Sequence, residues 1–145
     1  MRLALQQAEI AYKKDEVPVG AIIVKDNKVI AKAYNKREKT QDGTMHAEVI
    51  AIKKACKKLR TFRLNECELY VTLEPCAMCA GAIINSRVGK VVFGACDTKY
   101  GCAGSLYDLL SDKRFNHHPE VLGGVLEKEC ADILTRFFKQ KRKEK

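Results

Sequence analysis

The stretch Thr72-Leu73-Glu74-Pro75-Cys76-Ala77-Met78-Cys79 lies between two different sequence patterns. Before it, Glu68–Leu73 alternates in polarity and is rich in β-forming residues, which predicts a central strand. From its middle onward, Pro75–Ser86 is rich in Ala, Ile and Met, which predicts a helix. Proline suits the first helical position because its missing N–H has no partner there in any case. The stretch therefore predicts a strand that turns directly into a helix.

Two cysteines and one histidine suggest a metal site. Cys76 and Cys79 differ by about 60° on a helix and face the same way, with Cys76 in a first turn that favours its thiolate. His46 follows the turn-like Asp42-Gly43-Thr44 and is expected to open another helix, where a neutral imidazole is favoured. One nitrogen and two sulfur ligands, with water in the fourth position, suit catalytic zinc. We therefore predict one zinc ion per chain, held by His46, Cys76 and Cys79.

Glu48 is the predicted catalytic residue. It lies two residues after His46, about 200° away on a regular helix, so it is not expected to be a ligand. A carboxylate beside the metal can take a proton from water and return it to a leaving amine. A structural zinc closed by Cys67, Cys96 or Cys102 is the alternative. None of these cysteines has a paired spacing, and Glu48 would then have no purpose.

Length and composition indicate one globular domain, residues 1–145, with a basic tail at 136–145. No apolar run approaches the roughly 18 residues of a membrane span. The first seven residues turn polar before a signal-type region can form. Seven cysteines without such a signal favour the reducing cytoplasm over a disulfide framework.

The charge is positive and clustered. The net charge is +9, and Arg136–Lys145 holds six basic residues and one acidic residue. Solubility alone is one explanation, but clustering of this kind is typical of a nucleic-acid contact. Because the tail is remote from His46 in sequence, it is expected to bind phosphates without affecting turnover.

Strands and helices alternate along the chain, which predicts a three-layer α/β/α domain. In such sheets, sites form beyond the carboxyl ends of strands, and both Asn35 and the turn at Leu73–Cys76 are expected there. The remaining elements expected are a helix at Met1–Lys14, a hairpin of Val19–Val24 and Val29–Tyr34, a loop at Lys36–Gly43, a helix at Thr44–Lys58, a strand at Lys90–Ala95, a short helix at Ser105–Ser111, a strand at Glu120–Leu126 and a helix at Glu127–Lys143.

The patterns His-x-Glu and Pro-Cys-x-x-Cys are those of zinc nucleobase deaminases. The chain resembles the bacterial tRNA-specific adenosine deaminase family, within the cytidine deaminase-like superfamily. It departs from the family pattern at Gly43, Met45 and Cys96, where relatives often carry proline, a small residue and arginine. The resemblance rests on Glu16–Ala21, His46–Glu48, Leu73–Cys79, Val92–Ala95, Gly104–Ser105 and the basic tail after Phe137-Phe138.

The resemblance implies a five-stranded mixed sheet whose metal-bearing helices cross one face. It also implies a homodimer that deaminates adenosine to inosine at the wobble position of a tRNA anticodon loop. Asn35 matches the family asparagine that hydrogen-bonds the target base, and backbone groups near Ala47 would orient that base. Asp97 and Lys99 match a segment that borders the RNA in relatives.

Charge and aromatic character indicate which residues of the tail contact RNA. One of Phe137 and Phe138 is expected to pack and the other to stack on a base. The basic candidates are Arg136, Lys139, Lys141 and Arg142. Two other functions stay open: deamination of a free base or nucleotide (cytosine, a cytidine nucleotide or guanine), and a non-catalytic zinc-containing RNA-binding module.

Overall fold

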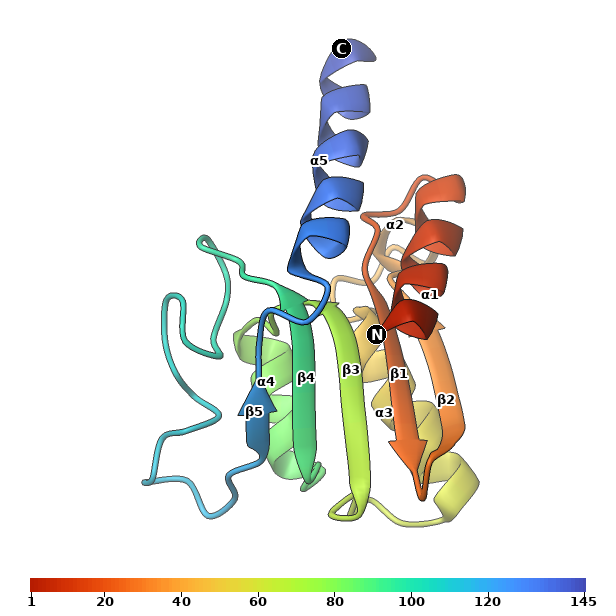
Figure 1. The fold of residues 1–145 in the computed structure, drawn as a ribbon. Helices are drawn as coiled ribbons and strands as arrows, with labels where there is room; N and C mark the ends of the chain where they lie inside the picture. The colour runs from red at the N-terminus through yellow and green to blue at the C-terminus, as the bar shows by residue number, and fades with distance from the viewer.

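Five strands pair into one mixed sheet of order β2-β1-β3-β4-β5, in a computed structural model that describes residues 1–145 (Figure 1). The pairings β1/β2 and β1/β3 are antiparallel, and β3/β4 and β4/β5 are parallel. The predicted hairpin and the predicted central strand are both confirmed. The strands are β1 (Gly20–Lys25), β2 (Lys28–Tyr34), β3 (Cys67–Leu73), β4 (Lys90–Ala95) and β5 (Glu120–Leu122).

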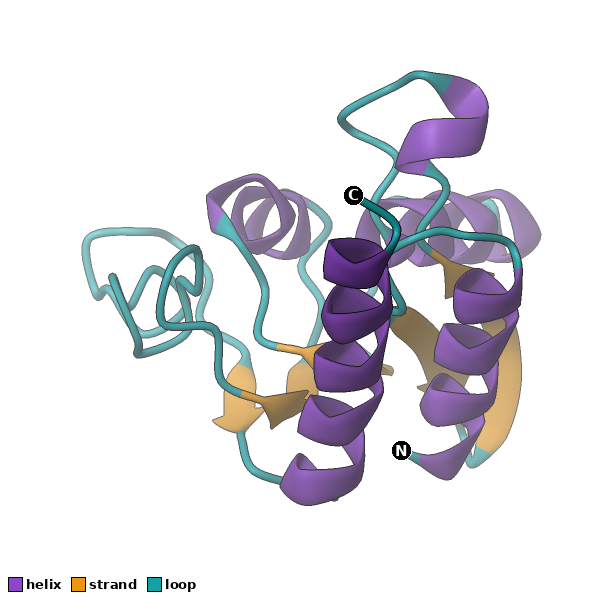
Figure 2. Ribbon diagram, turned by 90° about the horizontal axis from the view of Figure 1, so that it is seen from above, coloured by secondary structure: helices purple, strands orange, loops and turns teal.

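Helices cover both faces of the sheet, so the predicted three-layer α/β/α architecture is confirmed (Figure 2). One face carries α1 (Arg2–Lys13) and α5 (Glu127–Lys143), and the other carries α3 (Ala47–Leu59) and α4 (Ala77–Asn85). None of these helices has the length and apolar character needed to cross a membrane.

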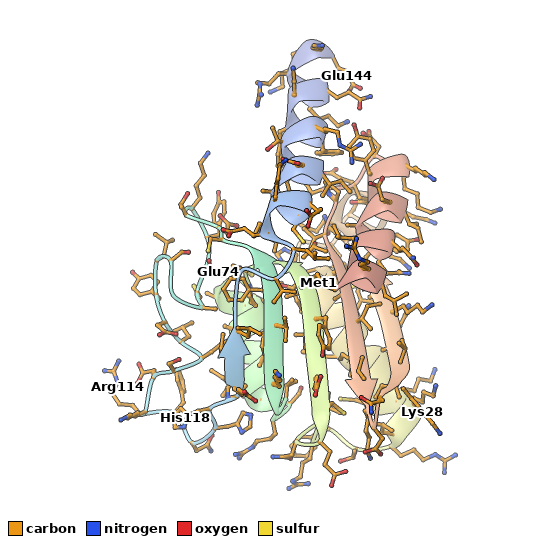
Figure 3. The ribbon with its side chains drawn as sticks, in the orientation of Figure 1. Met1, Lys28, Glu74, Arg114, His118 and Glu144 are labelled. Carbon is orange, nitrogen blue, oxygen red and sulfur yellow. The ribbon has the colours of Figure 1, made fainter.

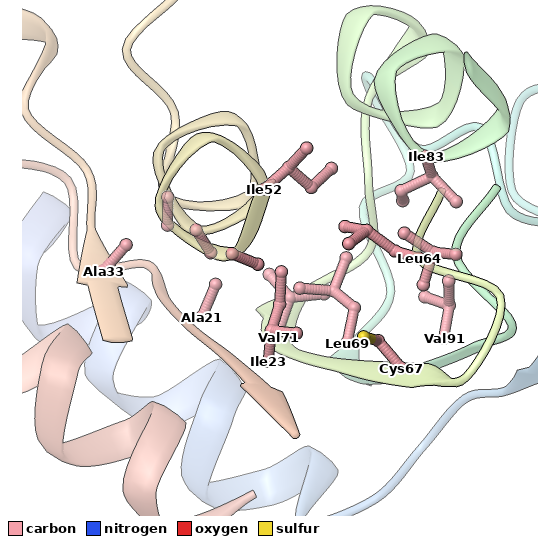
Figure 4. Close-up of a cluster of buried hydrophobic side chains, with 14 of the residues drawn as sticks. Ala21, Ile23, Ala33, Ile52, Leu64, Cys67, Leu69, Val71, Ile83 and Val91 are labelled. Carbon is pink, nitrogen blue, oxygen red and sulfur yellow. The ribbon is translucent and has the colours of Figure 1, made fainter. Parts of the chain in front are cut away.

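Close packing of α1 on the sheet explains one glycine. The alanines of α1 at its buried face, Ala4, Ala8 and Ala11, are fully buried. A Cβ at Gly20 would lie 2.0 Å from the carbonyl oxygen of Ala4. Small side chains on both sides therefore let α1 lie directly on β1. On the opposite face, β-branched and leucine side chains of the sheet pack against α3 and α4, as Figure 4 shows for Ile23, Leu69, Val91, Ile52 and Ile83.

The predicted loop at Lys36–Gly43 contains a short helix, α2 (Arg37–Thr40), so this expectation was wrong. The reason is a distant contact: the buried carboxylate of Glu16 accepts hydrogen bonds from the N–H groups of Glu38 and Lys39, at 2.9 and 2.8 Å. Helix α3 also begins three residues later than predicted. The side chain of Asp42 bonds the backbone and the hydroxyl of Thr44 and keeps that residue in a turn.

The predicted helix at Ser105–Ser111 was wrong. Ala103 pairs with Asp108 in an isolated antiparallel bridge, and the N–H groups of Ala103 and Ser105 bind the side chain of Glu74 instead of helical carbonyls. The last strand is also shorter than predicted. After Leu122 the chain turns at Gly124, which has a left-handed φ of +83°.

Candidate active site

Three strands deliver their carboxyl ends to one edge of the sheet. Strands β2 and β3 are both antiparallel to β1, and β3 is parallel to β4, so β2, β3 and β4 run the same way. Asn35 follows β2, Glu74 follows β3 and Cys96 follows β4. The start of α3, at His46, lies at this same edge. The structure thus brings together segments that are spread from Asn35 to Cys96 in the sequence.

His46 and Cys76 both occupy N-cap positions. His46 precedes α3 and Cys76 precedes α4, and each has an extended backbone, with ψ of 153° and 179°. The expectation that Pro75 begins the helix and that Cys76 lies in its first turn was wrong. Strand β3 ends at Leu73 and α4 begins only at Ala77, and the carbonyl of Cys76 accepts the first helical bond, from the N–H of Ala80 at 2.8 Å.

The donor atoms of three side chains form a tight triangle. Nδ1 of His46 lies 3.6 Å from Sγ of Cys76 and 3.5 Å from Sγ of Cys79. Tetrahedral bonds of roughly 2.1 Å to nitrogen and 2.3 Å to sulfur would separate such ligands by about 3.6 Å. The three residues therefore fit a zinc ion. No fourth histidine, cysteine or carboxylate belongs to the group, so one coordination position would be open to water.

Hydrogen bonds within the triangle control its protonation. The hydrogen bond with the Cys79 thiol is the main cause that lowers the pKa of the Cys76 thiol to about 4, and the hydrogen bond with His46 adds to it. The same contact and burial raise the pKa of Cys79. The bond with Cys76 raises the pKa of His46. Without a metal the pair therefore holds one thiolate, and a bound cation would release the second thiol proton.

Glu48 is 4% exposed and lies next to the triangle. Burial raises the pKa of its carboxyl group to about 7, because removal from water disfavours the charged form. A group with a pKa near ambient pH can both accept and donate a proton. The side chain of Glu48 lines the same cleft as His46 and is available for proton transfer there.

A cleft of about 680 Å³ opens above the triangle. Its inner wall is apolar where Val17, Val19 and Ala47 line it, and its rim carries cations, among them Arg37 and Lys99. An apolar interior with a cationic rim suits a flat base that carries phosphates. Of the residues predicted from sequence, the cleft is lined by Asn35, His46, Ala47, Glu48, Cys76, Asp97, Lys99, Phe138, Lys141 and Arg142.

Asn35 is held by backbone groups. Its Nδ2 donates to the carbonyl of Val17 at 3.3 Å, and its Oδ1 accepts from the N–H of Arg37 at 3.2 Å. The side chain is 5% exposed. An amide has a second N–H hydrogen and a second oxygen lone pair, so the side chain of Asn35 can still donate to a base and accept from it.

Helix α5 reaches the cleft, although the tail is remote from His46 in sequence. Phe137 is buried with its ring centroid 5.7 Å from that of Tyr12, and Arg136 pairs with Glu9 at 3.1 Å. These contacts hold α5 against α1. The ring of Phe138 packs edge-on against that of Phe137, with centroids 5.4 Å apart, but Phe138 is 44% exposed and lines the cleft. Thus Phe137 packs in the core, while Arg136 and Lys139 lie outside the cleft.

Two buried carboxylates near the cleft were missed from the sequence. Glu74 is 2% exposed, and its side chain accepts hydrogen bonds at 3.0 Å from the N–H groups of Asp97, Ala103 and Ser105, and at 2.5 Å from the Ser105 hydroxyl. Burial alone would raise the pKa of Glu74, but these bonds hold it below its usual value. A Cβ at Gly101 would lie 2.4 Å from its carboxyl carbon.

Glu16 holds α2 in the same way, and Arg37 of α2 lines the cleft. Figure 3 shows Glu74 at the end of the sheet from which α5 rises. The available sequence signal was an acidic residue between an apolar residue and proline, in Leu73-Glu74-Pro75. Glu16 also lies close to a proline, two residues before it, in Glu16-Val17-Pro18.

A three-layer domain with His-x-Glu and Pro-Cys-x-x-Cys at the starts of two neighbouring helices defines a deaminase of the cytidine deaminase-like fold. A family model of MafB19-like deaminases matches residues 1–142. The tRNA-specific adenosine deaminase of Bacillus subtilis (strain 168) is 53% identical over 145 residues, which are 100% of this chain and 90% of that protein. The tRNA-specific adenosine deaminase of Aquifex aeolicus (strain VF5) is 47% identical over 142 residues, covering 98% and 93%.

A solved structure from work on A-to-I editing by tRNA:A34 deaminases at the wobble position of transfer RNA is also similar. It matches with a TM-score of 0.89 and 44% identity, over 92% of this chain and 97% of that chain. The chain belongs to the family of tRNA-specific adenosine deaminases, and the resemblance drawn from its sequence is confirmed.

The hydrogen bonds of Glu74 yield a prediction about stability. In Glu74→Gln an amide faces four donors with a single acceptor oxygen, so some N–H groups lose their partner. We expect unfolding in urea to become easier by about 1–3 kcal/mol. Amide hydrogen exchange of residues 97–105 should accelerate. Glu120→Gln, at an exposed position on β5, is the control and should change stability by under ~0.5 kcal/mol. Equal stability and exchange in both variants would contradict this role for Glu74.

Proposed function

We propose that the protein converts adenosine to inosine, with release of ammonia, at the wobble position of a tRNA anticodon loop. A zinc ion held by His46, Cys76 and Cys79 is part of the proposal. The observation that carries it is full-length identity of 53% to a protein named as a tRNA-specific adenosine deaminase. The triangle of metal-binding atoms beside a buried glutamate supports the same chemistry.

A zinc ion bound there would act as a Lewis acid and lower the pKa of a water molecule toward ~7. Glu48 would accept one proton of the attacking water and pass it to the ring nitrogen of adenine. It would then carry the second proton of that water to the amine, which leaves as ammonia while the C6–N bond breaks and a C6 carbonyl forms. Its pKa of about 7 suits both steps, because neither protonation state is strongly disfavoured near neutral pH. His46, Cys76 and Cys79 hold the ion and take no proton from the substrate.

The base would enter the cleft between apolar side chains. Val17, Val19 and Ala47 line the inner wall, and the amide of Asn35 is oriented by the backbone on both sides of it. An anticodon-loop base is already unpaired, so little energy is needed to bring it into the cleft. We assign orientation of the base to Asn35 and to backbone groups near Ala47.

The rim of the cleft would bind the phosphates next to that base. Lys99 lines the cleft, and so do Lys141 and Arg142 of α5. Phe138 of α5 also lines it and is 44% exposed. Phe138 is the ring that we expect to stack on a base. Asp97 has a different role, because it does not bind phosphate. Its carboxylate accepts hydrogen bonds from the N–H groups of Lys99 and Tyr100 and thereby shapes the rim.

The proposal also includes one deaminase domain at residues 1–145, a homodimer and a cytoplasmic location, where tRNA is available. Exposed apolar side chains on the loop held by Glu74 support an interface between copies: Tyr100 and Tyr107 are each 68% exposed and Leu106 is 51% exposed. A free-base substrate would give the cations of α5 no phosphate to bind. A purely structural zinc would leave buried Glu48 without a role.

The metal assignment predicts a difference between cysteines. Purified protein should hold about one zinc per chain by elemental analysis, and Cys76→Ala or Cys79→Ala should lose it because the three ligands act as a set. Cys56→Ala, at a half-buried cysteine of α3 outside the triangle, is the control and should keep its zinc. Full zinc occupancy in both ligand variants would refute the assignment.

The role of Glu48 can be separated from metal binding. Glu48→Ala should keep its zinc and its affinity for an anticodon hairpin, but lose roughly 10²–10⁴-fold in kcat because the proton carrier is gone. Glu66→Ala, at a residue whose side chain is 78% exposed, is the control and should turn over normally. A Glu48→Ala enzyme within about tenfold of the parent would show that another group moves the proton.

A further inference from the structure

A second basic cluster lies on and after α3, separate from the basic tail. Between Val49 and Asn65 there are six basic residues and no acidic one. All six side chains are exposed, and none forms an ion pair. We call this cluster the basic track, and it consists of Lys53, Lys54, Lys57, Lys58, Arg60 and Arg63.

Helix stability accounts for only part of the track. Its four lysines lie within an arc of about 140° on α3, so they form one face. Lysines at the end of a helix interact favourably with its dipole, which explains Lys57 and Lys58. Lys53 is in the middle of α3, and like charges four residues apart, such as Lys53 and Lys57, destabilise a helix. Arg60 and Arg63 follow the helix altogether.

The track starts beside the candidate active site. Lys54 donates to the carbonyl of Lys32 on edge strand β2 at 2.7 Å, and burial together with the charge of Lys36 lowers the pKa of Lys54. Lys36 directly precedes Arg37, which lines the cleft. From there α3 runs about 20 Å toward the hairpin end of the sheet, where Figure 3 labels Lys28. Positive charge is therefore continuous from the cleft rim along one side of the molecule.

The far end of the track carries an exposed aromatic ring. Phe62 is 53% exposed, and the guanidinium of Arg63 lies 4.5 Å from its ring centroid. Folding gives no reason to expose a phenylalanine among cations. Basic side chains alternating with an exposed ring are what a surface needs in order to hold phosphates and stack on a nucleotide.

We propose that the basic track binds the sugar–phosphate backbone of the tRNA outside its anticodon loop. This inference rests on the proposed function, because the track is continuous with the cleft that would receive the loop. The contact would add affinity and register without reading sequence. An RNA seated in the cleft could then reach Lys53, Lys57 and Lys58 in turn, and Arg63 with Phe62 last.

The test compares two variants that each lose four charges. The track variant combines Lys53→Gln, Lys57→Gln, Lys58→Gln and Arg63→Gln, and keeps Lys54 because it bonds β2. The matched control replaces four exposed cations away from the track: Arg2→Gln, Lys13→Gln, Lys113→Gln and Lys128→Gln. Binding of a full-length tRNA and of a short anticodon hairpin is measured at several salt concentrations, with kcat and KM for both RNAs.

We expect the track variant to bind tRNA at least about tenfold more weakly than the control. If two of the four cations contact phosphates, the slope of log affinity against log salt concentration should flatten by roughly 2. KM for tRNA should rise while kcat is unchanged, and the hairpin should lose less affinity than the tRNA. Equal tRNA affinities of the two variants would overturn the proposal. So would a change of oligomeric state in light scattering, which would make this face an interface between copies, or an equal loss for both RNAs.

Failure of the proposed function would look different. A parent protein that forms no inosine in tRNA would refute that function, whereas selective loss of tRNA binding in the track variant would still support an RNA-binding track. Unchanged inosine formation in the hairpin by the track variant would show that the fold and the cleft are intact.

Discussion

The contact between the imidazole of His46 and the thiols of Cys76 and Cys79 is the constraint on which the site depends. It requires α3 and α4 to begin at the same edge of the sheet, and the parallel run of β2, β3 and β4 makes that edge a common end. Distances of 3.5 and 3.6 Å between nitrogen and sulfur leave a space that suits a tetrahedral zinc ion. Because the metal would need both thiolates, binding it would also lock together two helices that reach the edge from different parts of the chain.

The cleft walls rely on a second kind of contact, between buried carboxylates and loop backbone. Glu16 and Glu74 carry negative charge into the interior without a cationic partner, and only N–H groups and one hydroxyl compensate for it. Hydrogen bonds to a carboxylate are stronger than neutral ones, so each side chain can hold a loop that has little regular structure. Glu16 holds α2, whose Arg37 lines the cleft, and Glu74 holds the backbone of Asp97, which lines it as well.

Elements governed by local pattern were predictable from the sequence. The bounds of β4 and α5 agree with those expected, and the hairpin turn at Asp26-Asn27 has the two positive φ values that such a turn demands. Errors arose where distant residues decide the local structure: α2 depends on Glu16, and residues 103–108 depend on Glu74. No periodicity in either segment reports these contacts.

The candidate site divides in the same way. The metal-binding set and Glu48 follow from spacing and chemistry within short motifs. The presence of Phe138 in the cleft does not, because it depends on the angle of α5, which packing of Phe137 against Tyr12 fixes. Sequence could place cations in the tail but could not show that Lys141 and Arg142 line the same cleft as the metal-binding residues.

The most direct measurement is product analysis with two RNA hairpins that differ in where the target adenosine lies, and with free bases and nucleosides. The zinc-loaded protein is incubated with an anticodon hairpin that carries adenosine at the wobble position, with a hairpin that carries it only in the paired stem, and with free adenosine, cytidine, cytosine and guanine. We expect inosine and equimolar ammonia from the first RNA alone. Ammonia from a free base or nucleoside, with no inosine in the loop, would contradict it and make the protein a small-molecule deaminase.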